Sequence, residues 1–169
     1  RSTRQSTLFP YTTLFRSCIT VCAGAKSILD LHNTLEYLET MSVLVLGFQT
    51  DTLPAFYVRD SGLALEHRVE NAEDIAAIIR ARDRLGITTG ILVTNPISEE
   101  DQVDPKKHEK VLQAALKKAA EEGITGKAVT PYILAYMQKN LHGVILANIS
   151  LIKSNAALGT QIAVALQNG

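Results

Sequence analysis

The sequence has no tryptophan, few cysteines and no excess of charge of either sign. Its two cysteines, Cys18 and Cys22, lie four residues apart with no histidine cluster beside them. This spacing predicts neither a zinc site nor a disulfide framework, and it suits a reducing cytoplasm. Because 17 basic residues balance 17 acidic ones, the net charge gives no reason to expect nucleic acid or an anionic membrane as a partner. We also find no apolar run long enough to span a bilayer.

What remains is the composition of an ordinary globular protein. Hydrophobic residues make up 46% and charged residues 20% of the 169 residues, which is enough for one domain with a sizeable core. Residues 1–17 differ, because they contain no acidic residue and follow neither a helical nor a strand period. They resemble translated sequencing-adapter DNA, so we expect a non-native leader there and exclude it from the fold.

Strand and helix signals alternate along the rest of the chain. Short apolar runs at residues 19–22, 43–48 and 91–94 predict buried strands. Capping residues and apolar periods of 3.6 residues predict the helices. One helix is expected to begin at Ser27. The others are expected to span residues 33–41, 71–85, 105–122, 130–140 and 146–167. The alternation favours an α/β fold, a layered α/β/α arrangement with a largely parallel sheet.

Lys26 occupies the turn between the first strand and the helix that follows it. In α/β folds, ligands gather in the crevice at the carboxyl ends of the strands. A lysine there is either a solvated loop cation or an amine nucleophile. Burial against apolar strand ends would disfavour the ammonium form and free the lone pair to attack a carbonyl carbon. Position alone leaves both interpretations open.

The last helix carries two amides on its apolar side. At 100° per residue, Asn148 and Asn155 fall within an arc of small and apolar residues. That arc is predicted to face the core, and it comprises Ile149, Ile152, Ala156, Gly159, Ile162, Ala163 and Leu166. A buried amide without a partner costs about 1–3 kcal/mol. The two amides therefore either bond to neighbouring backbone or meet a polar ligand at the edge of the core.

Two other polar residues have simpler interpretations. Asp51 follows the second strand, where an aspartate can orient a ligand hydroxyl but more often caps a turn, and we favour the turn. His108 lies near the apolar arc of the helix at residues 105–122, which is expected to face inward with Leu112 and Leu116. A single histidine in such a place usually packs in the core, so we assign it no role.

Taken together, several segments resemble the pseudouridine-5'-phosphate glycosidase family, also called indigoidine synthase A-like. They occur in the family's order: residues 21–30 (VCAGAKSILD), 34–40 (TLEYLET), 47–51 (GFQTD), 54–57 (PAFY), 90–93 with 95–97, 126–127 with 130–131, and 148–149 with 155–156. The resemblance covers residues 18–169 and corresponds to the C-terminal part of a single family domain. It implies that the α/β/α fold is incomplete here, because the N-terminal half is missing.

The resemblance also implies a reaction. Family members reversibly cleave the carbon–carbon glycosidic bond of pseudouridine 5'-phosphate, giving uracil and ribose 5-phosphate. Lys26 matches the lysine that forms the family's Schiff base, Asn148 matches a substrate-binding asparagine, and Asn155 matches a second one. The family's manganese ligand and general acid lie in its upstream half, so no metal ligand is expected in this chain. Family trimers imply a homo-oligomer.

These implications leave three readings of the isolated chain. The first is the C-terminal part of a glycosidase with little turnover alone, because an amine without its acid and phosphate contacts lacks most of the transition-state stabilisation. The second is a non-catalytic truncated remnant with at most weak sugar-phosphate binding. The third is an unrelated lysine-dependent carbonyl enzyme of the aldolase type.

Overall fold

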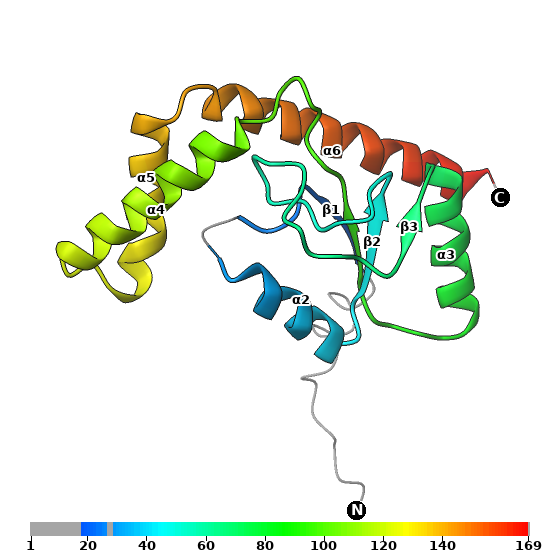
Figure 1. The fold of residues 1–169 in the computed structure, drawn as a ribbon. Helices are drawn as coiled ribbons and strands as arrows, with labels where there is room; N and C mark the ends of the chain where they lie inside the picture. The colour runs from blue at the N-terminus through cyan, green and yellow to red at the C-terminus, as the bar shows by residue number, and fades with distance from the viewer. Residues whose placement is uncertain (1–17, 27–28, 169) are drawn as a thin grey trace, which may run out of the picture.

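The computed structural model describes residues 18–26 and 29–168, so the predicted leader at residues 1–17 lies outside the described part. Within it, one sheet is formed by β1 (Ile19–Cys22), β2 (Leu44–Phe48), β3 (Arg68–Val69) and β4 (Ile91–Thr94), as Figure 1 shows. The helices are α2 (Leu31–Thr40), α3 (Ala72–Arg84), α4 (Pro105–Glu121), α5 (Val129–Asn140), α6 (Val144–Gln167) and the short 3₁₀ helix η1 (Gly126–Ala128).

The strands are parallel and lie in the order β1-β4-β2-β3. Ile91 at the start of β4 lies opposite Ile19 of β1 on one side and Leu44 of β2 on the other. Parallel sheets are covered on both faces, which explains why β2 and β4 are continuous apolar runs rather than alternating ones. The α/β fold with a parallel sheet is therefore as predicted from the sequence.

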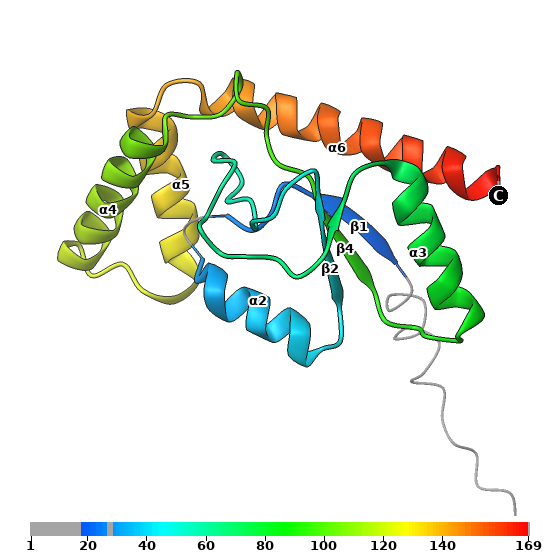
Figure 2. The same ribbon diagram turned by 45° about the vertical axis from the view of Figure 1, so that its right-hand side comes forward.

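Helices lie on both sides of this sheet. Figure 2 shows α3 and α6 together on one side and α2 on the other. The core between the sheet and the α3–α6 pair is built from buried aliphatic side chains: Leu46, Val69, Ala72, Ile75, Ile79, Ile91, Val93, Leu158 and Ile162. Burial of these side chains stabilises the layers, at about 25 cal/mol per Å² of apolar surface.

A second core lies beyond the carboxyl ends of the strands. Helices α4 and α5 pack against each other there, α5 also contacts α6, and buried side chains from all three helices share this core. Its buried members are Ala23, Tyr57, Ile97, Val103, Leu112, Ala115, Ile133, Met137, Leu141, Val144, Ala147 and Leu151. Helix α6 thus joins both cores, with Leu151 in one and Leu158 in the other.

Two predicted helix starts are wrong. Asp30 caps α2 by accepting hydrogen bonds from the backbone N–H of Asn33 at 3.0 Å and from its side-chain amide at 2.7 Å. Asn33 therefore lies in the first turn instead of opening a helix. Ser27, which was predicted to begin a separate helix, lies outside the described residues. Helix α5 begins at Val129 with no side-chain cap bond, because η1 leads directly into it and Thr130 is already helical.

The buried face of α6 is also not the predicted one. Val144, Ala147, Leu151, Leu158 and Ile162 are buried, whereas the predicted inward residues Ile149 and Ile152 are 44% and 62% exposed. The observed face is rotated by roughly a quarter turn from the predicted arc. Apolar residues occur nearly all round this helix, so periodicity could not select which side meets the sheet.

By length and composition alone, α6 is apolar enough to cross a membrane, with a mean hydropathy of 1.3 over its most apolar stretch. Our prediction that no run is long enough was wrong on that criterion. The core helix of a water-soluble protein meets the same criterion, and α6 contacts α3, β1 and α5 in this structure.

Candidate functional site

Lys26 follows a sharp turn at the carboxyl end of β1. Gly24 has a φ of +81°, a left-handed conformation that glycine adopts without a side-chain clash. The turn is held against the segment after β2, because Gly24 forms an antiparallel bridge with Ala55. The backbone N–H of Phe56 also donates to the carbonyl oxygen of Ala23 at 3.0 Å. The first strand and the loop at residues 54–57 therefore fix the position of Lys26 together.

Lys26 and Asn148 line one cavity of about 300 Å³. The wall joins the turn after β1, the loop after β2, helix α5 and the start of α6: Lys26, Phe56, Tyr57, Leu134, Met137, Gln138, Val144, Ile145, Asn148 and Ile149. A mostly apolar cavity with a few polar groups is typical of small-molecule sites. The structure thus brings together two residues that are 122 positions apart and that the sequence nominated separately.

Aromatic rings form one wall of this cavity. The Lys26 Nζ lies 5.8 Å from the centroid of the Phe56 ring, within the range of a cation–π contact. The Phe56 and Tyr57 rings meet edge to face with centroids 4.6 Å apart. Tyr57 is buried, and burial raises the pKa of its hydroxyl. Sequence reasoning assigned neither aromatic residue a role, and their proximity to Lys26 depends on the loop pairing with β1.

Asn155 lies elsewhere on α6. Its side-chain oxygen accepts a hydrogen bond at 3.0 Å from the amide of Asn95, and Asn95 also donates to Ser154 Oγ at 2.9 Å. Asn95 is buried directly after β4, so this bond ties the end of that strand to α6. Asn155 is not among the described residues that line the Lys26 cavity. Its oxygen meets a side chain instead of the neighbouring backbone, and substrate contact by Asn155 stays a prediction.

No carboxylate lines the cavity in the part of the chain that the structure describes. Within residues 18–26 and 29–168, no group of three or more histidine, cysteine, aspartate or glutamate residues could hold a metal ion. A manganese ligand stays a prediction for the upstream half of the family, and we derive no chemical step through that metal. The only side chains of the described cavity wall that ordinarily gain or lose a proton are Lys26 and Tyr57.

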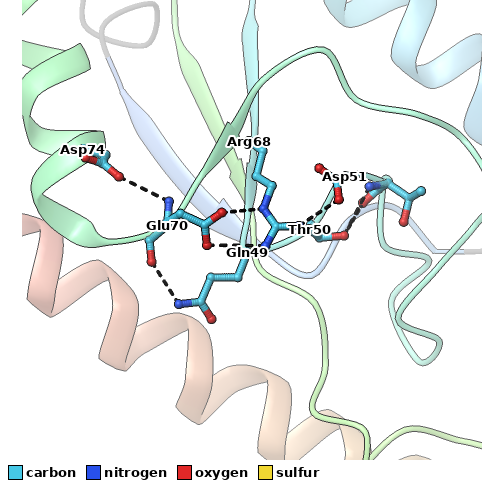
Figure 3. A network of polar contacts seen from close by, with 7 residues as sticks. Gln49, Thr50, Asp51, Arg68, Glu70 and Asp74 are labelled. Carbon is cyan, nitrogen blue, oxygen red and sulfur yellow. Dashed lines mark hydrogen bonds and ion pairs between the residues drawn. The ribbon is translucent and has the colours of Figure 1, made fainter.

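A separate polar network lies at the ends of β2 and β3 (Figure 3). Arg68 forms ion pairs with Glu70 and, at 2.8 Å, with Asp51. The side-chain amide of Gln49 donates to the Glu70 carbonyl at 2.9 Å, and the Glu70 N–H donates to Asp74. The side chain of Asp51 pairs with Arg68, while Thr50 Oγ1 accepts from the Thr52 N–H within the turn. The favoured interpretation of Asp51 as the turn cap is therefore wrong.

The amino-acid sequence is similar to proteins of known activity. The family described as indigoidine synthase A like protein matches residues 12–165. A pseudouridine-5'-phosphate glycosidase from Symbiobacterium thermophilum is 51% identical over 160 residues, which cover 94% of this chain and 52% of that protein. The corresponding glycosidase from Caldanaerobacter subterraneus subsp. tengcongensis is 49% identical over 147 residues, covering 86% and 48%. The chain spans about half the length of these curated relatives.

Solved structures resemble the chain over the same extent. The crystal structure of the prealnumycin C-glycosynthase AlnA in complex with ribulose 5-phosphate is 35% identical, with a TM-score of 0.84 over 94% of this chain and 53% of that one. An indigoidine synthase A-like protein from Thermotoga maritima is 31% identical, with a TM-score of 0.75 over 92% and 52%. The likeness therefore extends through both cores and α6.

Proposed function

The chain belongs to the indigoidine synthase A-like family, as its sequence resemblance predicted, and on that premise we propose that it carries the amine nucleophile of a pseudouridine-5'-phosphate glycosidase. The proposed reaction reversibly splits pseudouridine 5'-phosphate into uracil and ribose 5-phosphate. The observation that carries the proposal is the shared cavity of Lys26 and Asn148. The ribulose 5-phosphate bound by the related C-glycosynthase supports a five-carbon sugar phosphate as the substrate class.

A lysine suits this reaction because the bond to be broken joins two carbons. We propose that the C1'–O4' bond breaks to open the sugar ring, with O4' taking up a proton, and that the neutral Lys26 nitrogen bonds to C1' and loses a proton. A proton added to the uracil carbon then lets the nitrogen lone pair expel uracil. The C1'–uracil bond breaks, and C1' and the nitrogen form an iminium. Water hydrolyses the iminium, which releases ribose 5-phosphate and restores the amine.

Each residue of the site has its own proposed role. Lys26 supplies the nucleophile, and the cavity that it shares with Asn148 would hold the sugar. Asn148 can donate through its amide nitrogen and accept through its oxygen, so it suits sugar hydroxyls. The mostly apolar wall would exclude water from the reacting atoms. Asn155 of α6, which accepts a hydrogen bond from Asn95 at the carboxyl end of β4, is proposed as a second, more distant substrate contact.

We propose that the 169 residues turn over little or no substrate alone. The described cavity wall has no carboxylate to protonate the uracil carbon, and a general acid contributes about 10²- to 10⁴-fold to such a step. The complete enzyme of this family would use manganese, with residues that the described part of the chain does not supply. We further propose that the complete protein is a cytoplasmic homo-oligomer, a trimer as the family resemblance implied.

A second candidate function is a non-catalytic remnant that binds sugar phosphate weakly. The absence of an acid from the described cavity wall favours it, whereas the position of Lys26 in that cavity favours the enzyme. The third interpretation, an unrelated aldolase-type enzyme, is set aside because the family is established by identity near 50%.

Borohydride trapping tests the proposal directly. The 169-residue chain is incubated with ribose 5-phosphate and sodium borohydride, and the modified lysines are mapped by peptide mass spectrometry. We expect a reduced pentose-phosphate adduct at Lys26, formed faster than at the exposed Lys153 of α6. Lys26→Arg should abolish that adduct, and ribose without phosphate should label Lys26 more slowly.

The outcomes separate the candidates. Equal labelling of Lys26 and Lys153 would contradict the nucleophile assignment. Binding of ribose 5-phosphate to the chain without an adduct at Lys26 would support the non-catalytic remnant. Release of uracil from pseudouridine 5'-phosphate by the chain alone would overturn the proposal that it has little turnover.

A further inference from the structure

Phe56 has an unusual backbone conformation beside the nucleophile. Its φ is +67°, in the left-handed region that residues with a side chain rarely adopt. Such strain persists only where the surrounding structure enforces it, and it gathers at functional sites. The strained residue here is the one whose ring faces the Lys26 amine.

Hydrogen bonds on both sides of Phe56 enforce this conformation. Its N–H donates to the carbonyl of Ala23 at 3.0 Å, and the N–H of Ala55 donates to the carbonyl of Val58 at 2.9 Å. The next residue, Tyr57, accepts from the N–H of Val103 at 3.0 Å. The loop is thus bonded both to the turn that precedes Lys26 and to the segment that precedes α4. The backbone therefore fixes the position of the ring relative to Lys26.

The ring itself is supported from behind. Tyr57 meets Phe56 edge to face at 4.6 Å, and the buried His108 lies against Tyr57 with ring centroids 6.5 Å apart. This stack extends from α4 to the cavity, and only its last ring, that of Phe56, faces the amine at 5.8 Å. The arrangement presents an aromatic face to whatever charge forms on the Lys26 nitrogen.

That charge needs a partner during the proposed reaction. An ammonium has three N–H donors, whereas a protonated imine keeps the positive charge and has one, so it makes fewer hydrogen bonds with water. The described side chains of the cavity wall include no carboxylate to compensate it. An aromatic face attracts a cation electrostatically, and this attraction does not depend on how many N–H donors the cation has.

We propose that Phe56 is a positioning residue that holds the Lys26 nitrogen and stabilises positive charge on it, and that this stabilisation is greater for the poorly hydrated iminium with the sugar phosphate than for the ammonium. The iminium part of this role rests on the proposed function. Phe56 touches the reactive side chain and not the bond that breaks, so its effect on the reaction is exerted through Lys26.

A fluorination series at position 56 isolates this electrostatic effect from shape. Phe56 is replaced in the 169-residue chain by mono-, di- and trifluorophenylalanine, which progressively weaken the negative ring face at nearly constant size. We expect the yield of the Lys26 borohydride adduct with ribose 5-phosphate to fall stepwise with each fluorine. Phe56→Leu removes the aromatic face and should lower the adduct yield by roughly two- to fivefold. Phe56→Tyr keeps an aromatic face and should give the yield of the unaltered protein. The same fluorinated residues at Phe48, in β2, serve as the matched control and should leave the yield unchanged.

A second measurement does not depend on imine chemistry. A lysine held over a ring has side-chain protons shifted upfield by the ring current, so the Cε protons of Lys26 should move downfield in Phe56→Leu. If Lys26 is labelled but its yield is constant across the fluorine series, the inference fails and the proposed function stands. If Lys26 is not labelled, the proposed function and the iminium role both fail, and the ring-current shift then decides the ammonium contact. Identical Cε shifts in the two proteins would overturn that contact as well.

Discussion

A Cβ atom on Gly24 would lie 1.7 Å from the carbonyl oxygen of Pro54. No side chain can be accommodated at that distance, so the turn before Lys26 and the loop after β2 can approach as they do only with glycine. We predict that Gly24→Ala destabilises the fold by about 3 kcal/mol or more, since backbone must move and the left-handed φ is also strained. Urea unfolding measures the loss, and borohydride labelling of Lys26 should fall in the same variant.

Gly62 provides the matched control for that substitution. Its φ of +80° is nearly that of Gly24, but nothing lies within 4 Å of an added Cβ. Gly62→Ala therefore reports the backbone strain alone, about 1 kcal/mol. Equal losses of stability in the two variants would show that contact with Pro54 does not constrain the turn.

Substitution of Asn155 should mainly lower stability, whereas substitution of Asn148 should mainly weaken binding of the sugar phosphate. Asn155→Ala removes one of the two acceptors for the buried amide of Asn95 and should cost about 1 kcal/mol of stability. Asn148→Ala should cost less stability, because Asn148 lies at the cavity edge, but should weaken handling of the sugar phosphate more. Urea midpoints and the ribose 5-phosphate concentration for half-maximal labelling of Lys26 separate the two effects. Small and equal changes in labelling would leave neither amide with a role in binding.

The sequence predicted three of the four described strands, because each is a local apolar pattern, and missed the two-residue β3. The strand at Ile19–Cys22 is a short run of mostly apolar and β-branched residues, and Lys26 follows it after three small residues, so its place near the carboxyl end of this strand needs no long-range information. The cap of α3 was equally clear: Asn71, the predicted first residue of the helix, accepts from the Asp74 N–H. Local chemistry determines each of these features.

The sequence could not predict features that depend on which elements meet. Leu85 and Leu116 fit the apolar period of their helices, yet they are 74% and 36% exposed. Periodicity identifies an apolar arc but not its partner, and the nearly all-apolar α6 is the extreme case. The contact between Phe56 and Lys26 was missed for the same reason, since it arises from bridging between segments that are 30 residues apart in the sequence.

The polar network of Figure 3 should contribute to the stability of the sheet edge and not to the chemistry of the Lys26 cavity. Arg68 and its partners Asp51 and Glu70 are exposed, and water and salt screen such pairs. We predict that Arg68→Met lowers stability far less than Gly24→Ala does, and that the difference between Arg68→Met and the unaltered protein shrinks as salt is raised. Lys26 labelling should not change. A large loss of labelling in Arg68→Met would instead connect this network to the cavity.

His108 should make the stability of the fold depend on pH near neutrality. It is 3% exposed on α4, and burial lowers the pKa of its imidazole below the ordinary value, with a smaller opposing effect from Glu109. The unfolded chain therefore takes up a proton at a pH where the folded chain does not. Stability is complete above the unfolded-state pKa of about 6.5 and falls as pH drops from there through the lower folded-state pKa. The urea midpoint should accordingly be lower at pH 5.5 than at pH 7.5.

Substitution assigns this dependence to one residue. His108→Phe removes the titrating group while keeping a ring against Tyr57, so the difference in midpoint between pH 5.5 and 7.5 should shrink. His142→Gln alters an exposed histidine and should leave the difference intact. Because the carboxylates of Asp101 and Asp104 have a lowered pKa from hydrogen bonds, their contribution is lost only at a more acidic pH and does not overlap this window. A dependence that persists in His108→Phe would show that the buried imidazole is not its source.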